Sequence, residues 1–186
     1  MRHRRLIALL PLVLTGCGYN TIQSLDEKAN AAKQQIEVQL QRRADLVPNL
    51  VEVVRGQAKQ ELEVFTQVAR ARSGLVDAVQ KGDPGQMAEA NEQLTTAMRG
   101  LMIQVEAYPQ IKSDQAFLRL QDELTGTENR IAVSRTDLNG AVETYNTYIR
   151  KFPQVMTAKV IGAKPKEYFE VSNAAAREAP KIDLTK

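Results

Sequence analysis

Side chains that carry chemistry are scarce in this chain. It contains one histidine, one cysteine and no tryptophan, and only 5% of its residues are aromatic. The histidine is His3 and the cysteine is Cys17, so the residues after Cys17 have neither an imidazole nor a thiol. Catalytic triads, thiolate or imidazole zinc sites and redox thiol pairs are therefore excluded there. The sequence also lacks phosphate-binding glycine loops and carboxylates at calcium-loop spacing. We expect no enzyme activity, no metal and no cofactor.

The first sixteen residues combine a basic start with a short apolar run. Residues 6–14 are apolar, and Leu14-Thr15-Gly16-Cys17 completes the segment. Nine helical residues reach roughly 14 Å, about half of a ~30 Å hydrocarbon core, so the run is too short to span a membrane. The string Leu14-Thr15-Gly16-Cys17 resembles a bacterial lipobox. This resemblance implies cleavage before Cys17 and lipidation of Cys17 by diacylglycerol and a further fatty acyl group such as palmitate. The alternative is an ordinary secreted protein in which this cysteine occurs by chance.

The expected lipid also predicts where the protein resides. Two or more acyl chains hold a protein durably at a membrane, so membrane lipid is the first expected partner. Gly18, rather than an aspartate, follows the cysteine. By resemblance to lipoprotein sorting signals, this implies the outer membrane, facing the periplasm, where the source has two membranes.

Charge gives no indication of a polyanionic partner. The formal net charge is +3, and Arg2, Arg4 and Arg5 of the expected signal account for all of it. The remainder is balanced, with no arginine-rich run and no basic patch interleaved with aromatic residues. We therefore expect no nucleic-acid binding.

Apolar residues recur at steps of three and four along most of the chain, which predicts amphipathic helices. The expected helices run from about residue 21 to 44, from 47 to 81, from 84 to the Tyr108-Pro109 pair, and from 113 to 152. Gly82 is expected to cap the second helix at its C-terminus, Asp83 with Pro84 to start the third, and Ser113 to cap the fourth. Tyr108-Pro109 is expected to close the third helix, and Pro153 to end the fourth.

Pro48 decides how many helices the chain forms. In a helix interior, proline removes a hydrogen bond and clashes with the preceding turn, at about 3 kcal/mol. We therefore expect a tight reversal near Asp45 to Pro48 and an all-α, elongated antiparallel four-helix bundle. The alternative has three long helices, the first kinked at Pro48. The domain plan is a signal peptide (1–16), a lipid-anchored start (17–20), the bundle (21–153) and a segment (154–186) that docks on the bundle or extends from it.

Several strings in the chain are similar to those of a known family. The longest is Gln35 to Glu52, with the sequence QIEVQLQRRADLVPNLVE. Further strings include Phe117 to Gln121, Thr127 to Ala132, Tyr145 to Ile149 and Tyr168 to Glu170. Together they resemble the LemA family from Tyr19 to about Leu184. The resemblance implies an envelope-facing four-helix bundle and no established activity, with a lipid here in place of the uncut N-terminal helix of many relatives.

Polar residues within these strings are the candidate sites. Arg42, Arg43, Asp45 and Asn49 flank the expected reversal, where they either cap and pair within the fold or form an interaction patch. Thr127, Glu128, Asn129 and Arg130 interrupt an apolar stripe, so they form a polar network between helices or line a ligand pocket. Tyr145, Tyr148 and Phe152 share one helix face and are expected in the core, with a binding role as the alternative.

Two classes of function fit these observations. We expect a membrane-anchored, non-enzymatic binding or scaffold protein that engages another envelope protein through a bundle face or its C-terminal segment. The alternative is a small-molecule carrier or enzyme with a pocket between helices. An exposed contiguous apolar patch favours the first class, and an enclosed cavity with convergent polar groups favours the second.

Overall fold

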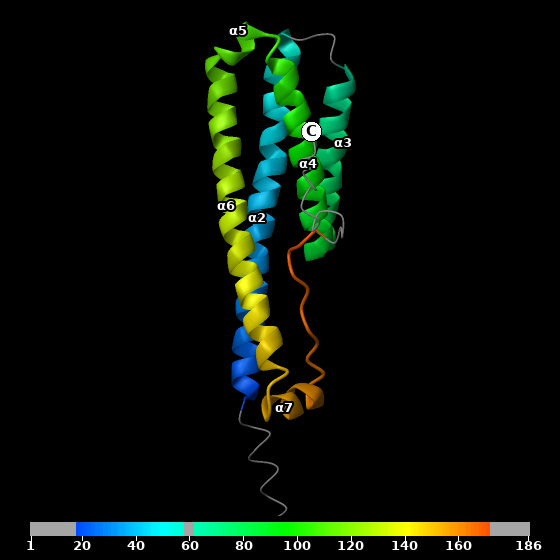
Figure 1. Ribbon diagram of the computed structural model, residues 1–186, viewed down its shortest axis with the longest axis vertical. Coiled ribbons are helices and arrows are strands. Elements are labelled where there is room, and N and C mark those ends of the chain that lie inside the picture. The colour runs from blue at the N-terminus through cyan, green and yellow to red at the C-terminus, as the bar shows by residue number, and fades with distance from the viewer. Residues whose placement is uncertain (1–17, 58–61, 172–186) are drawn as a thin grey trace, which may run out of the picture. The chain divides into compact units, whose positions relative to one another are not determined.

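The structure is a computed structural model that describes residues 18–57 and 62–171, and all regular structure in these residues is helical (Figure 1). The helices are α2 (Tyr19–Gln57), α3 (Leu62–Lys81), α4 (Pro84–Val105), α5 (Pro109–Lys112), α6 (Gln115–Tyr148) and α7 (Gln154–Val160). The all-α prediction is confirmed, whereas a single four-helix bundle remains a prediction. No helix within the described residues is both long and apolar enough to cross a membrane.

The chain divides into two compact units. Among the described residues, unit 1 comprises 18–43 and 122–168, and unit 2 comprises 44–57, 62–121 and 169–171. Unit 1 therefore contains the first part of α2, most of α6, all of α7 and the segment that follows. Unit 2 contains the end of α2, the start of α6 and the helices α3, α4 and α5, with α3 packed along α4.

Pro48 lies inside α2, so the predicted reversal at Asp45 to Pro48 is wrong. A proline in a helix lacks the amide that would donate to the carbonyl four residues earlier, here that of Ala44. Arg72 of α3 replaces the missing donor, because its Nε donates to the Ala44 carbonyl at 2.7 Å. The helix therefore continues through Pro48, as in the kinked-helix alternative. It ends at Gln57, however, and α3 begins as a separate helix at Leu62.

Local signals fix three of the other helix ends. Gly82 has a φ of +68°, and the Asp83 carboxylate accepts a hydrogen bond from the Gln86 amide at 2.9 Å, so both predicted caps are confirmed. The predicted Ser113 cap of the long helix α6 is wrong by one residue. Asp114 Oδ1 accepts from the amides of Ala116 and Phe117 at 2.7 and 3.1 Å. A carboxylate in this position satisfies two of the amides that a helix start leaves without partners.

Each unit has an apolar core. In unit 2 the fully buried side chains include Leu50, Leu75, Met87, Leu94 and Leu101. In unit 1, Ile22 of α2 packs with Tyr145 near the end of α6, with Ile149 just after that helix and with Ala158 of α7. Tyr148 adds a partly buried ring to this cluster. The prediction that Phe152 belongs to the core is wrong, because its side chain is 83% exposed in the turn before α7.

Candidate functional site

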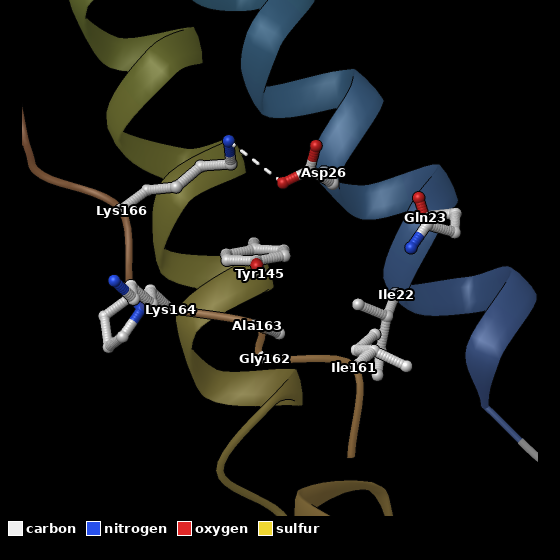
Figure 2. A pocket seen from close by; sticks show the side chains of 10 residues that line it. Ile22, Gln23, Asp26, Tyr145, Ile161, Gly162, Ala163, Lys164 and Lys166 are labelled. Carbon is white, nitrogen blue, oxygen red and sulfur yellow. Dashed lines mark ion pairs between the residues drawn. The ribbon is translucent and has the colours of Figure 1, made fainter. Parts of the chain in front are cut away.

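The candidate site is an open hollow of about 450 Å³ in unit 1. One wall is the first part of α2, with Ile22, Gln23 and Asp26, and Tyr145 of α6 forms the second wall. The segment after α7, residues 161–166, closes the third side (Figure 2). The hollow therefore brings together parts of the chain that are about 140 residues apart in sequence.

Lys166 organises the polar side of this hollow. Its Nζ lies 3.0 Å from Asp26 Oδ1 and donates to Asn30 Oδ1 at 2.8 Å. The same ammonium group lies 5.4 Å from the centroid of the Tyr145 ring, within cation–π range (Figure 2). Asn30 in turn donates from Nδ2 to Asp26 Oδ2 at 3.0 Å. The ammonium group thus has a carboxylate, an amide oxygen and an aromatic face as partners.

Asn146 holds the backbone of the segment that carries Lys166. Its Nδ2 donates to the Lys166 carbonyl at 2.9 Å, and its Oδ1 accepts from the Lys166 amide at 2.8 Å. A buried asparagine amide therefore pairs with both backbone groups of one residue, as a neighbouring β-strand would. This double contact positions Lys166 in front of Asp26.

The electrostatics of the hollow disfavour ionisation of Tyr145. Burial raises the pKa of the Tyr145 hydroxyl, and the nearby negative charge of Asp26 raises it further. Both causes act in the same direction, because each disfavours a phenolate. Tyr145 is therefore a neutral hydrogen-bonding and cation–π group at physiological pH rather than a base.

The arrangement offers little for catalysis. The lining has no histidine, cysteine or pair of carboxylates, and its one acidic group, Asp26, is engaged by Lys166 and Asn30. Residues 18–57 and 62–171 contain no group of three or more His, Cys, Asp or Glu residues placed to hold a metal ion. The chemistry available is the recognition of a small polar or apolar group at an open surface.

The first predicted patch does not remain together as an exposed group. Arg42 of unit 1 and Asp45 and Asn49 of unit 2 are exposed on α2, whereas Arg43 is only 2% exposed. Arg43 Nη2 pairs with Glu128 Oε1 of α6, and both residues belong to unit 1. Burial lowers the pKa of the Arg43 guanidinium, and the Glu128 carboxylate partly opposes that effect.

The second predicted group is also divided. Thr127 is fully buried and donates from its hydroxyl to the Leu124 carbonyl of its own helix at 2.7 Å. Glu128 is half exposed, and Asn129 and Arg130 are exposed. The structure therefore joins the two predicted groups through Arg43 and Glu128. Cys17 lies outside the described residues.

Sequence reasoning missed the cluster around Lys166. The Tyr145-Asn146 pair lies within a LemA-like string, but Asn30 and Lys166 lie outside these strings. A weak signal was available, since Asp26 and Asn30 are four residues apart and so share one helix face. Nothing in the local sequence indicates that their partner lies more than 130 residues later.

Comparison with known proteins places this fold in a family. The sequence model of the LemA family matches residues 32–184, most of the chain. The chain belongs to the LemA family. This confirms the family indicated by its sequence strings, and the match includes Arg43, Glu128, Tyr145 and Lys166.

Three magnetosome proteins are similar to this chain. Magnetosome proteins MamQ 1 and MamQ 2 of Paramagnetospirillum magneticum are each 31% identical to this chain over 178 residues. Magnetosome protein MamQ of Magnetospirillum gryphiswaldense is 30% identical over 177 residues. The alignments cover 82% and 81% of this chain, respectively. They cover 64% of each relative, so the chain spans just under two thirds of the proteins that it matches.

Proposed function

We propose that this LemA-family chain is a non-enzymatic binding or scaffold protein of the cell envelope, anchored to a membrane by lipid on Cys17. The observation that carries the non-enzymatic part is the arrangement around Lys166. Asp26, Asn30 and the Tyr145 ring all contact its ammonium group, so the polar groups of the hollow stabilise the fold. The carboxylate of the hollow and the ammonium group beside the Tyr145 ring are therefore paired with each other, which supports a binding surface over a catalytic one.

The anchoring part rests on the lipobox-like string that ends at Cys17. Intact-mass analysis of the protein from envelope membranes should show a chain that begins at Cys17 and carries acyl groups. Cys17→Ser removes the sulfur that must receive diacylglycerol, so the acyl mass should disappear. An intact Met1, or an unmodified Cys17 in the membrane fraction of the wild type, would refute the anchor. Fractionation should place the wild type in the outer membrane where the source has two membranes, because Gly18 follows the cysteine.

The binding partner is proposed to be another envelope protein. The LemA-family match and the three similar magnetosome proteins support a membrane-associated protein of the envelope. Crosslinking in intact envelopes, followed by capture of the tagged chain, should recover the same protein repeatedly from wild type. Arg42→Ala tests the exposed arginine of the candidate patch, and exposed Arg135 of α6 is the control. Loss of the crosslink with an unchanged thermal midpoint would assign Arg42 to recognition.

A small-molecule carrier is the second candidate, and the mixed polar and apolar lining of the hollow supports it, although the hollow is open rather than enclosed. Ile22, Ile161 and Pro165 give the hollow an apolar part beside its polar one. Native mass spectrometry of the protein isolated from envelopes should then reveal a bound molecule in stoichiometric amount. Ile161→Arg would block the hollow at a partly exposed position and should abolish that binding. If neither the wild type nor Ile161→Arg carried a non-covalently bound molecule, the carrier function would be ruled out.

A further inference from the structure

The helix α7 has apolar residues on opposite faces, and only one of these faces is covered by the protein. Thr157 and Ala158 are buried against unit 1. Met156 and Val160 on the other face are 57% and 77% exposed, and Phe152 in the preceding turn is 83% exposed. Met156 and Val160 are four residues apart and share one face of α7. Phe152 precedes this helix by two residues, in the turn that leads into it. Three large apolar side chains exposed within nine residues are a candidate contact surface.

Along the chain, the charged residues that flank this face are all basic. Residues 144–166 contain five basic residues and no acidic residue. Lys166 is engaged by Asp26, whereas Arg150, Lys151, Lys159 and Lys164 are exposed. Exposed apolar side chains bordered by lysine and arginine are typical of segments that lie in the interface of an anionic membrane. The exposed cations favour a lipid surface over an uncharged apolar partner.

The position of Gly18 connects this face with the expected anchor. A Cβ atom built on Gly18 would lie 3.4 Å from the Tyr148 hydroxyl and 3.4 Å from Gln154 Cγ. Gln154 is the first residue of α7, so the residue that follows Cys17 lies beside the start of that helix. Figure 1 shows the start of α2 and α7 at the same end of unit 1. Lipid on Cys17 would bring the membrane surface to α7.

We propose that the face formed by Phe152, Met156 and Val160 docks into the headgroup region of the membrane that holds Cys17. Lys151 and Lys159 contact the phosphates of anionic phospholipids there. This docking rests on the proposed anchoring and adds a second, non-covalent contact to it. A lipid on one residue tethers the chain at a single point, whereas the docked face also fixes how unit 1 is oriented on the membrane.

The absence of tryptophan makes a direct test possible. Phe152→Trp places a single indole on the docking face, and Val133→Trp places one at a 61% exposed position of α6 as the matched control. Val133 lies 15 residues before Tyr148, roughly 22 Å along the helix. Both lipidated full-length proteins are reconstituted into vesicles of phosphatidylethanolamine and phosphatidylglycerol, with brominated or ordinary acyl chains. Flotation measures anchoring, and tryptophan quenching by bromine measures insertion.

The expected result is that both variants float with the vesicles while only Phe152→Trp shifts to shorter emission wavelength and loses most of its fluorescence to brominated lipid. The quenching should weaken when phosphatidylcholine replaces phosphatidylglycerol. Flotation with no quenching of Phe152→Trp would overturn docking and leave the anchor intact. Equal quenching of both variants would show that the membrane does not contact this face in preference to the rest of unit 1, and this would overturn the docking. A blue shift of Phe152→Trp emission without quenching by brominated lipid would assign the face to a protein surface instead. Failure of the protein to float with the vesicles would refute the anchor and the docking together.

Discussion

The contact between Arg72 and the Ala44 carbonyl should decide whether α2 tolerates Pro48. Ala44 is fully buried, and its carbonyl has no helical donor because residue 48 is proline. Arg72→Met keeps most of the side-chain stem and removes the Nε donor at 2.7 Å. An unsatisfied buried acceptor costs about 1–3 kcal/mol. With a urea dependence of about 1–3 kcal/mol per M, the unfolding midpoint should fall by roughly 1 M.

A double-mutant cycle separates this explanation from a general packing effect. In a Pro48→Ala background, the amide of residue 48 can donate to the Ala44 carbonyl, so Arg72→Met should cost much less than in the wild type. The coupling should be about 1–2 kcal/mol. Urea unfolding followed by far-ultraviolet circular dichroism measures all four proteins. Arg70→Met is the control, since Arg70 is exposed on the same helix and should change stability by less than ~0.5 kcal/mol.

The reasoning would be refuted if Arg72→Met destabilised both backgrounds equally. That outcome would mean that the guanidinium stabilises unit 2 by packing or by charge, independently of residue 48. A loss no larger than that of Arg70→Met would likewise show that the Ala44 carbonyl does not depend on Arg72.

Three further predictions concern unit 1. Glu128→Ala removes the carboxylate that compensates the buried Arg43 guanidinium, and it should lower the free energy of unfolding by about 1–3 kcal/mol. Arg43→Met removes the buried charge itself and should lower the free energy of unfolding by less, and urea unfolding compares the two variants. The Tyr145 hydroxyl has a raised pKa in the folded protein, so as pH rises the unfolded chain loses the hydroxyl proton first and the free energy of unfolding should fall above pH ~10. Tyr145→Phe should weaken this fall. An unchanged slope of the unfolding midpoint against pH in Tyr145→Phe would contradict the prediction. Asn146→Ala removes the hydrogen-bond partners of the Lys166 amide and carbonyl and should lower the free energy of unfolding by about 1–3 kcal/mol. Lys166→Met removes a partly exposed ion pair and should lower it by about 0–1 kcal/mol. Thermal melts that rank the two variants in the opposite order would contradict the role of the buried Asn146 side chain.

The features predicted correctly from sequence are those whose physics is local. Gly82 and Asp83 cap helices through their own backbone conformation and a partner three residues away, so the pattern alone identifies them. The Pro48 prediction failed because the local penalty is offset by Arg72, 24 residues further along the chain. Sequence periodicity contains no information about such a donor. Periodicity therefore predicts where helices form. It does not predict whether a helix continues through a proline when another helix supplies the missing hydrogen-bond donor.

The candidate site shows the same limit more strongly. Arg43 and Glu128 were each identified as unusual, but assigned to different groups, because spacing along one helix does not indicate a partner 85 residues away. Lys166 was not identified at all. Its role depends on Asn146 and Asp26, which position its backbone and its ammonium group from two different helices. A site built from contacts between distant segments becomes visible only when the segments are placed.

Phe152 shows why an apolar stripe has two physical meanings. Its spacing from Tyr145 and Tyr148 matches a buried helix face, yet α6 ends at Tyr148 and the turn that follows directs Phe152 into solvent. The same spacing then continues into α7 through Met156 and Val160, where the neighbouring charges are all basic. A core stripe and a membrane-facing stripe share their periodicity, since both remove apolar side chains from water. What distinguishes them is charge of one sign beside the stripe and the proximity of an anchor. Here the charged residues from 144 to 166 are all basic, and Gly18, which follows the proposed anchor residue, lies beside the start of α7.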